Sequence, residues 1–172
     1  MSFATLREAA ESRARSILQQ FEITFVPVPV QIIAKKLGVA VQVMPLDDEL
    51  SGMAFIKNDV AMIVLNASHH PNRQRFTLAH ELAHHVLHRE YLTENVHVDT
   101  AVLSRNEKSA AGVHAKEVEA NAFAAELLMP RKELRKLGNV DVNDDVELAT
   151  LAKRFQVSVS AMAVRLESLQ YG

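Results

Sequence analysis

The chain has 172 residues and a formal net charge of -2, with 48% apolar and 23% charged residues, which is typical of a soluble globular protein with a buried core. This charge gives no chain-wide electrostatic attraction to nucleic acid or anionic membranes. Because cysteine is absent, disulfides, thiolate metal sites and cysteine nucleophiles are excluded. No stretch has the apolar core of a secretory signal or of a membrane span, so we expect a cytoplasmic protein with no membrane partner.

Hydrophobic periodicity predicts two helices in the N-terminal part of the chain, followed by strands. The first helix is predicted over 3–20, and a short second helix over 30–38 ends at Gly38, which suits the left-handed position after a helix. Three runs rich in β-branched and apolar residues predict the strands of a small antiparallel sheet: 39–46, 52–58 and 60–66.

The rest of the chain is predicted to be mostly helical. A histidine-rich helix is expected to begin near Pro71, and residues 95–112 lose the periodicity, which predicts a loop or a short irregular helix. Further helices are predicted at 115–129, 131–138, 146–155 and 158–169. These elements predict an α+β, mostly helical domain over 1–140, with a C-terminal helical hairpin over 141–172 packed on it as one compact unit.

The stretch RFTLAHELAHHVLHRE, residues 75–90, contains four of the eight histidines of the chain. On a helix, His80, Glu81 and His84 lie in one polar arc, while leucine, alanine and valine side chains fill the opposite side. Two imidazoles four residues apart can reach one cation, and the intervening glutamate can then contact a water activated by it. Zn²⁺ is the expected ion, although other divalent metals suit such ligands. His88 lies too far along a straight helix to share the ion with His80, so we expect it beside the ligands.

Because the five-residue pattern also arises by chance, a third ligand is required, and the stretch KEVEANAFAAELLMP offers two glutamates. With helical spacing, Glu117 falls on the apolar face and Asn121 follows one turn later. Glu119 points toward the side of Glu126, which we expect to be solvated. A carboxylate on a buried face needs a partner: a metal, or alternatively an arginine or lysine. We therefore predict Glu117 as the third ligand, and Asn121 as a hydrogen-bond partner that orients a ligating histidine.

The motifs RFTLAHELAHHVLH and EVEANAFAAELLMP resemble those of the ImmA/IrrE-type metallopeptidases, relatives of the gluzincins, with weaker likeness in IAKKLGVAVQVMPL and LAKRFQVSVSAMAVRL. The resemblance implies a zincin-like metallopeptidase fold, and the family's third ligand falls on Glu117 with Asn121 beside the ligands. It further implies an endopeptidase that cleaves a partner helix-turn-helix repressor, and so relieves repression under stress, DNA damage or phage infection.

In a zinc peptidase of this type, Glu81 is expected to take a proton from the activated water and to pass it to the leaving amine. Tyr91, His97 and His114 are candidates for stabilising the oxyanion, and the sequence does not choose among them. The strand over 60–66 is the expected edge to which an extended substrate adds.

Other functions compete with the peptidase. The segment LATLAKRFQVSVSAMAVRLESLQ could be a DNA-reading helix-turn-helix, but from Asp141 onward there are three basic and five acidic residues, which disfavours phosphate binding. The basic stretch Arg131, Lys132, Arg135 and Lys136 suggests single-stranded DNA as an activator. An inactive metal-binding partner of a toxin-antitoxin pair is the third alternative.

Overall fold

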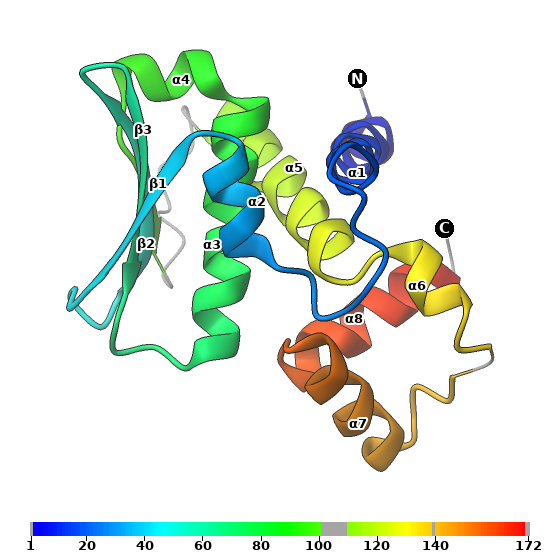
Figure 1. Ribbon diagram of the computed structural model, residues 1–172. Helices are drawn as coiled ribbons and strands as arrows, with labels where there is room; N and C mark the ends of the chain where they lie inside the picture. Colours follow the sequence, from blue (N-terminus) through cyan, green and yellow to red (C-terminus); the bar gives the residue numbers. More distant parts are fainter. Residues whose placement is uncertain (1, 101–109, 139, 171–172) are drawn as a thin grey trace.

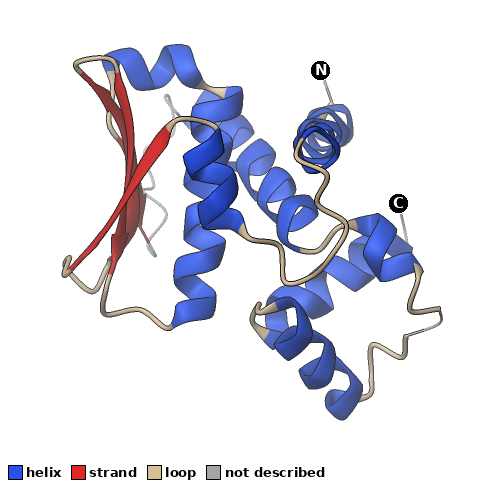
Figure 2. Cartoon of the chain, in the orientation of Figure 1, coloured by secondary structure: helices blue, strands red, loops and turns tan. Residues whose placement is uncertain are grey.

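The computed structural model describes residues 2–100, 110–138 and 140–170, and shows an α+β, mostly helical fold with a sheet at one side (Figure 1, Figure 2). The elements in chain order are α1 (Phe3–Gln20), α2 (Val30–Lys36), β1 (Val39–Met44), β2 (Leu50–Lys57), β3 (Val60–Asn66), α3 (Pro71–Leu87), α4 (Arg89–Glu94), β4 (His97–Thr100), α5 (Ala110–Leu128), α6 (Arg131–Arg135), α7 (Asp145–Phe155) and α8 (Val159–Gln170). The predicted fold class is confirmed. None of the described helices is long and apolar enough to cross a membrane.

The sheet has the strand order β1-β3-β2-β4. Strands β2 and β3 form an antiparallel hairpin and β4 pairs antiparallel with β2, but β1 runs parallel to β3. The sheet is therefore mixed, whereas an antiparallel sheet was predicted, because strand periodicity does not say which strands are neighbours. β3 is paired on both sides, so the prediction that it offers a free edge to a substrate is wrong.

The side chain of Asn66 binds the connection between β1 and β2 to the end of β3. Asn66 is fully buried at the end of β3, and its Nδ2 donates to the carbonyl oxygens of Asp47 and Leu50 at 3.1 and 2.8 Å. Its Oδ1 accepts a hydrogen bond from the backbone N–H of Leu46 at 3.3 Å. These bonds fold the connection between β1 and β2 around the end of β3, and they satisfy an amide that would be costly to bury unpaired.

Strand β4 is a correction to the predicted loop over 95–112, of which residues 101–109 lie outside the described part of the chain. It has only four residues, which alternate between half-buried and exposed. A run this short carries too little periodicity to be distinguished from a loop. Its pairing with β2, a strand more than forty residues earlier in the chain, makes it a strand.

Helix α3 lies between the sheet and α5 (Figure 1). Every residue of α3 from Thr77 to His85 is buried. Leu78 and Leu82 belong to the hydrophobic core, and the small side chains of Ala120 and Ala124 on α5 are fully buried within it. The polar face of α3 is thus as buried as its apolar face, which places its histidines and glutamate inside the molecule.

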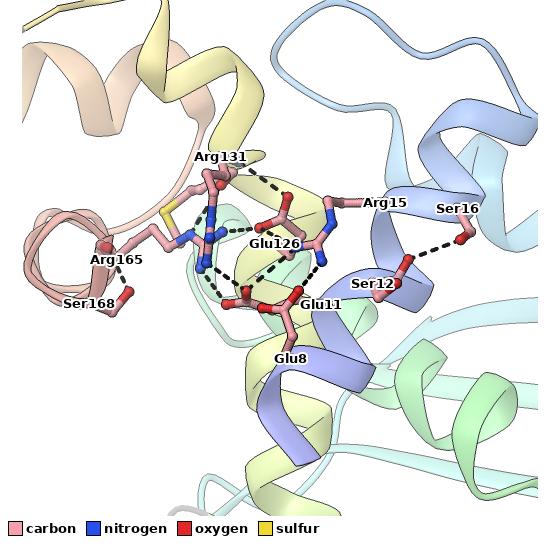
Figure 3. A network of polar contacts seen from close by, with 10 residues as sticks. Glu8, Glu11, Ser12, Arg15, Ser16, Glu126, Arg131, Arg165 and Ser168 are labelled. Carbon is pink, nitrogen blue, oxygen red and sulfur yellow. Dashed lines mark hydrogen bonds and ion pairs between the residues drawn. The ribbon is translucent and has the colours of Figure 1, made fainter. Parts of the chain in front are cut away.

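A buried ionic cluster joins α8 to α1 and α5 (Figure 3). Arg165 of α8 is 3% exposed and pairs with Glu126 of α5 and, at 2.7 Å, with Glu11 of α1. Arg131 at the start of α6 also pairs with Glu11, at 3.0 Å. The prediction of a solvated Glu126 is wrong: this residue is 1% exposed. Its cationic partner comes from another helix, so the periodicity of α5 alone could not reveal it.

We expect replacement of Arg165 by Met to lower the free energy of unfolding by about 3–5 kcal/mol, because it leaves Glu126 buried without its main cationic partner. Urea denaturation measures the change, and Arg13→Met on the exposed face of α1 serves as the control. A loss below about 1 kcal/mol in Arg165→Met would show that the cluster is not a stabilising contact.

Candidate metal centre

Two histidines of α3 direct the same ring nitrogen toward one point. His80 and His84 lie one helical turn apart, and their Nε2 atoms are 3.3 Å from each other. The other nitrogen of His80, Nδ1, donates to Oδ1 of Asn121 at 3.1 Å. This is the contact that the sequence predicted for Asn121. A histidine that donates through Nδ1 keeps the lone pair of Nε2 free for a cation.

Glu117 of α5 completes this convergence. Its Oε2 lies 3.1 Å from Nε2 of His80, and its Oε1 lies 3.5 Å from Nε2 of His84. The structure therefore brings together the three side chains predicted as ligands. No described arginine or lysine pairs with Glu117, so the competing arrangement is absent from the described residues.

Glu119, the other candidate third ligand, lies at the edge of this group. Its Oε2 is 3.1 Å from Nε2 of His88. Nδ1 of His88 is in turn 3.1 Å from Nδ1 of His84. His88 follows the last residue of α3 and, as expected, contacts a predicted ligand without joining the central group.

His97, at the start of β4, is the residue whose place the sequence could not fix. Its Nε2 lies 2.9 Å from Oε1 of Glu117, and its Nδ1 lies 3.0 Å from Oε2 of Glu81. Its ring stacks on that of His84 with 3.7 Å between centroids. His97 was one of three candidates for the oxyanion, and the missing signal was the unpredicted strand β4.

The other two candidates for the oxyanion make contacts elsewhere. The ring of Tyr91 lies under the ammonium group of Lys116, and the ring of His114 packs against Phe3. The structure thus brings only His97, among the three, into contact with Glu81 and the predicted ligands.

Glu81 is fully buried, and only one of its two carboxylate oxygens has a hydrogen-bond partner. Its Oε2 is hydrogen-bonded to His97, but its Oε1 has no partner. Burial raises the pKa of Glu81, although the contact with His97 opposes that rise. An unpaired carboxylate oxygen is costly in a protein interior unless another group reaches it, and a water beside the ligands would do so.

Two of the four donors, His84 and Glu117, are held in the protonation state that binds a metal. Burial lowers the pKa of His84 far below its usual value, and His97 and His80 lower it further, so this imidazole is neutral. Burial acts to raise the pKa of Glu117, but hydrogen bonds with His80 and His97 outweigh it and hold the pKa well below the usual range. A neutral imidazole and an ionised carboxylate are the forms that ligate a metal. Burial lowers the pKa of His80, but the hydrogen bond with Glu117 and the charge of Glu81 outweigh it and raise this pKa. A metal would therefore have to displace a proton from His80.

Four donor residues meet in this place. One ligand atom from each of His80, His84, His97 and Glu117 lies within 4.8 Å of all the others. Nitrogen and oxygen donors of this kind suit Zn²⁺, although they do not by themselves fix the metal. The group can hold a metal ion, and the unpaired oxygen of Glu81 is consistent with a water next to it.

The pKa of His97 predicts a pH dependence in the metal-free protein. Burial lowers this pKa, but hydrogen bonds with Glu117 and Glu81 outweigh burial and raise it from 6.5 to about 10. A group whose pKa is higher in the folded state than in the unfolded state stabilises the fold fully below its unfolded-state pKa. This stabilisation is lost as the pH rises through the folded-state pKa. With a chelator present, unfolding free energy should therefore fall between about pH 6.5 and 10 more steeply than in His97→Gln. Urea denaturation across this range tests it, and parallel curves would contradict it.

Comparison with known proteins places the chain in a family. The family model for the IrrE N-terminal-like domain, Peptidase_M78, matches residues 34–167, which include α3 and α5. No curated protein matches the chain. A solved structure described as a Mycobacterium tuberculosis transcriptional regulator is similar with a TM-score of 0.61 over 94% of this chain, at 17% identity. At this identity the likeness shows the fold alone. The chain spans about half of that protein, 51% of its length.

The family match covers most of the chain and contains both motifs whose side chains meet at the candidate metal centre. It thus supports a metallopeptidase-like domain, in agreement with the resemblance noted in the sequence. The chain belongs to the Peptidase_M78 family of IrrE N-terminal-like domains.

Proposed function

We propose that the protein is a zinc-dependent endopeptidase that hydrolyses a peptide bond in a partner helix-turn-helix transcriptional repressor. The main support is the convergence of His80, His84 and Glu117 beside the buried, half-satisfied carboxylate of Glu81. Family membership supports the reaction class. The choice of a repressor as substrate, and a role in stress, DNA-damage or phage defence in the cytoplasm, rest on the family resemblance.

The residues divide the chemistry between them. Zn²⁺ bound by His80, His84 and Glu117 would supply a Lewis acid that polarises a peptide carbonyl and makes water nucleophilic near neutral pH. Glu81 is the general base: its Oε1 accepts a proton from the attacking water, and the same carboxyl group then donates it to the leaving amine. Asn121 accepts from Nδ1 of His80 and keeps Nε2 directed toward the centre.

A DNA-binding regulator is less well supported than a peptidase. Arg165, one of three basic residues after position 141, is held in the ionic cluster and cannot contact phosphate. Activation by single-stranded DNA has less support. It would depend on the basic stretch that begins at Arg131, but Arg131 pairs with Glu11 and Lys136 pairs with Glu133. Salt-insensitive binding of single-stranded DNA would end that proposal.

The replacement Glu81→Gln tests whether the protein is an enzyme. We expect cleavage of the repressor to fall about 10²–10⁴-fold, because the amide cannot accept the proton, while the zinc content stays unchanged. Gel electrophoresis of the repressor and elemental analysis of the variant measure both quantities. An inactive metal-binding partner would lose nothing on this substitution, so unchanged function would favour that alternative.

The choice of the third ligand is tested by zinc retention. We expect Glu117→Gln to weaken Zn²⁺ binding by at least about tenfold. Loss of a side chain that merely orients a ligand already lowers metal affinity about 10–100-fold, and loss of a ligand should lower it at least as much. Glu119→Gln, two residues away on the same helix, is the matched control. Competition with a chromophoric chelator gives the affinities, and a larger loss in Glu119→Gln than in Glu117→Gln would reverse the assignment.

A further inference from the structure

The number of donors at the centre is unusual for a peptidase. Catalytic zinc sites have three protein ligands and leave one position open, whereas sites closed by four protein ligands are structural. Here four donor residues lie within 4.8 Å of one another. Three of them, His80, His84 and Glu117, come from the central helices α3 and α5, and the fourth, His97, comes from β4 at the edge of the sheet.

Strand β4 is short and lies at one edge of the described sheet. Among the described strands it pairs with β2 alone, with Val98 opposite Met53 and His97 opposite Ala54. Val96 and Val98 are 54% and 41% exposed, so they add little apolar burial. Short segments with few buried contacts open locally at low free-energy cost. The His97 side chain, in contact with Glu81 and Glu117, is therefore a main attachment of the strand.

The edge of β2 covered by β4 is also where a substrate would be expected to lie. Proteins often hold extended peptides by adding them as a strand to a sheet edge. β3 is paired on both sides, and the partner of β2 on its outer side carries His97 into the centre. A peptide paired with that edge of β2 would run past Glu81, and it could not do so while β4 is there.

We propose that His97 is a displaceable fourth metal ligand, and that β4 occupies the substrate edge of β2, so that the resting protein is closed and a peptide must displace β4. This inference rests on the proposed peptidase function. It adds a latent state to that function. In this state His97 closes the metal site, and its strand β4 covers the substrate edge of β2.

The replacement His97→Ala tests the ligand in the full-length protein. We expect Zn²⁺ affinity to fall by about tenfold or more, and the visible absorption of the Co²⁺-loaded protein to change because one nitrogen donor is lost. His85→Ala is the control, since His85 of α3 is a buried histidine outside the group of four donors, and its Nε2 donates to the carbonyl oxygen of Met62. Unchanged Zn²⁺ affinity and an unchanged Co²⁺ spectrum in His97→Ala would overturn the proposal, while Glu81→Gln would still test the peptidase function independently.

Cleavage of fluorescein-labelled casein tests the closed state. If the open form is about one molecule in ten, His97→Ala should cleave about tenfold faster than the wild type. The double variant with Glu81→Gln should be inactive, which excludes a contaminating protease. Weaker Zn²⁺ binding without faster cleavage would overturn the closed state.

A disulfide across the two strands tests displacement without changing a ligand. Met53 and Val98 are directly opposite, and cross-strand Cα distances fall in the range that a disulfide can bridge. Because the chain has no cysteine, Met53→Cys with Val98→Cys creates one defined pair. Oxidation should abolish casein cleavage, and reduction by a phosphine should restore it, at constant zinc content.

The control pair joins two strands that the proposal leaves fixed. Phe55 of β2 and Met62 of β3 are also directly opposite, and Phe55→Cys with Met62→Cys should cleave equally in both redox states. Equal cleavage by the oxidised and reduced forms of the β2–β4 pair would overturn displacement of β4.

Discussion

The candidate metal centre depends on two buried ring nitrogens that face each other, Nε2 of His80 and Nε2 of His84. His80 donates through Nδ1 to Asn121, and its Nε2 lies 3.3 Å from Nε2 of the neutral His84. Two lone pairs at that separation repel unless a proton or a cation lies close to both. Glu117 adds negative charge to the same space. The arrangement therefore requires positive charge. A metal ion would supply it, and in its absence protons on His80 and His97, whose pKa values are both raised, supply it.

The parts of the site that sequence could predict are those governed by helical spacing. A period of 3.6 residues puts His80, Glu81 and His84 on one arc, and it separates Glu117 from Glu119 on α5. The structure brings the chosen residues together, with Asn121 against His80 as predicted. These assignments need only local geometry and the cost of burying a carboxylate, which are both properties of the sequence near each residue.

The features that sequence could not predict depend on contacts between distant segments. The place of His97 follows from pairing of a four-residue strand with β2, and no short run of residues encodes that pairing. The mixed sheet depends on the parallel pairing of β1 with β3, and Asn66 binds the connection between β1 and β2 at the end of β3. Glu126 looked solvated because its partner Arg165 lies on another helix. In each case the place of a polar side chain depends on partners from another element of the fold.

The C-terminal helices contribute to the metal centre through the orientation of α5. Glu117 and Glu126 are nine residues apart on this helix, so at 100° per residue they point in opposite directions. Glu126 and Glu11 hold Arg165 of α8 on the far side, where the cluster fixes the rotation of α5 about its axis (Figure 3). A rotation that freed Glu126 from Arg165 would also turn Glu117 away from His80 and His84. The ionic cluster thus helps to orient a carboxylate that it does not touch, and through α5 it links the C-terminal helix α8 to the candidate metal centre.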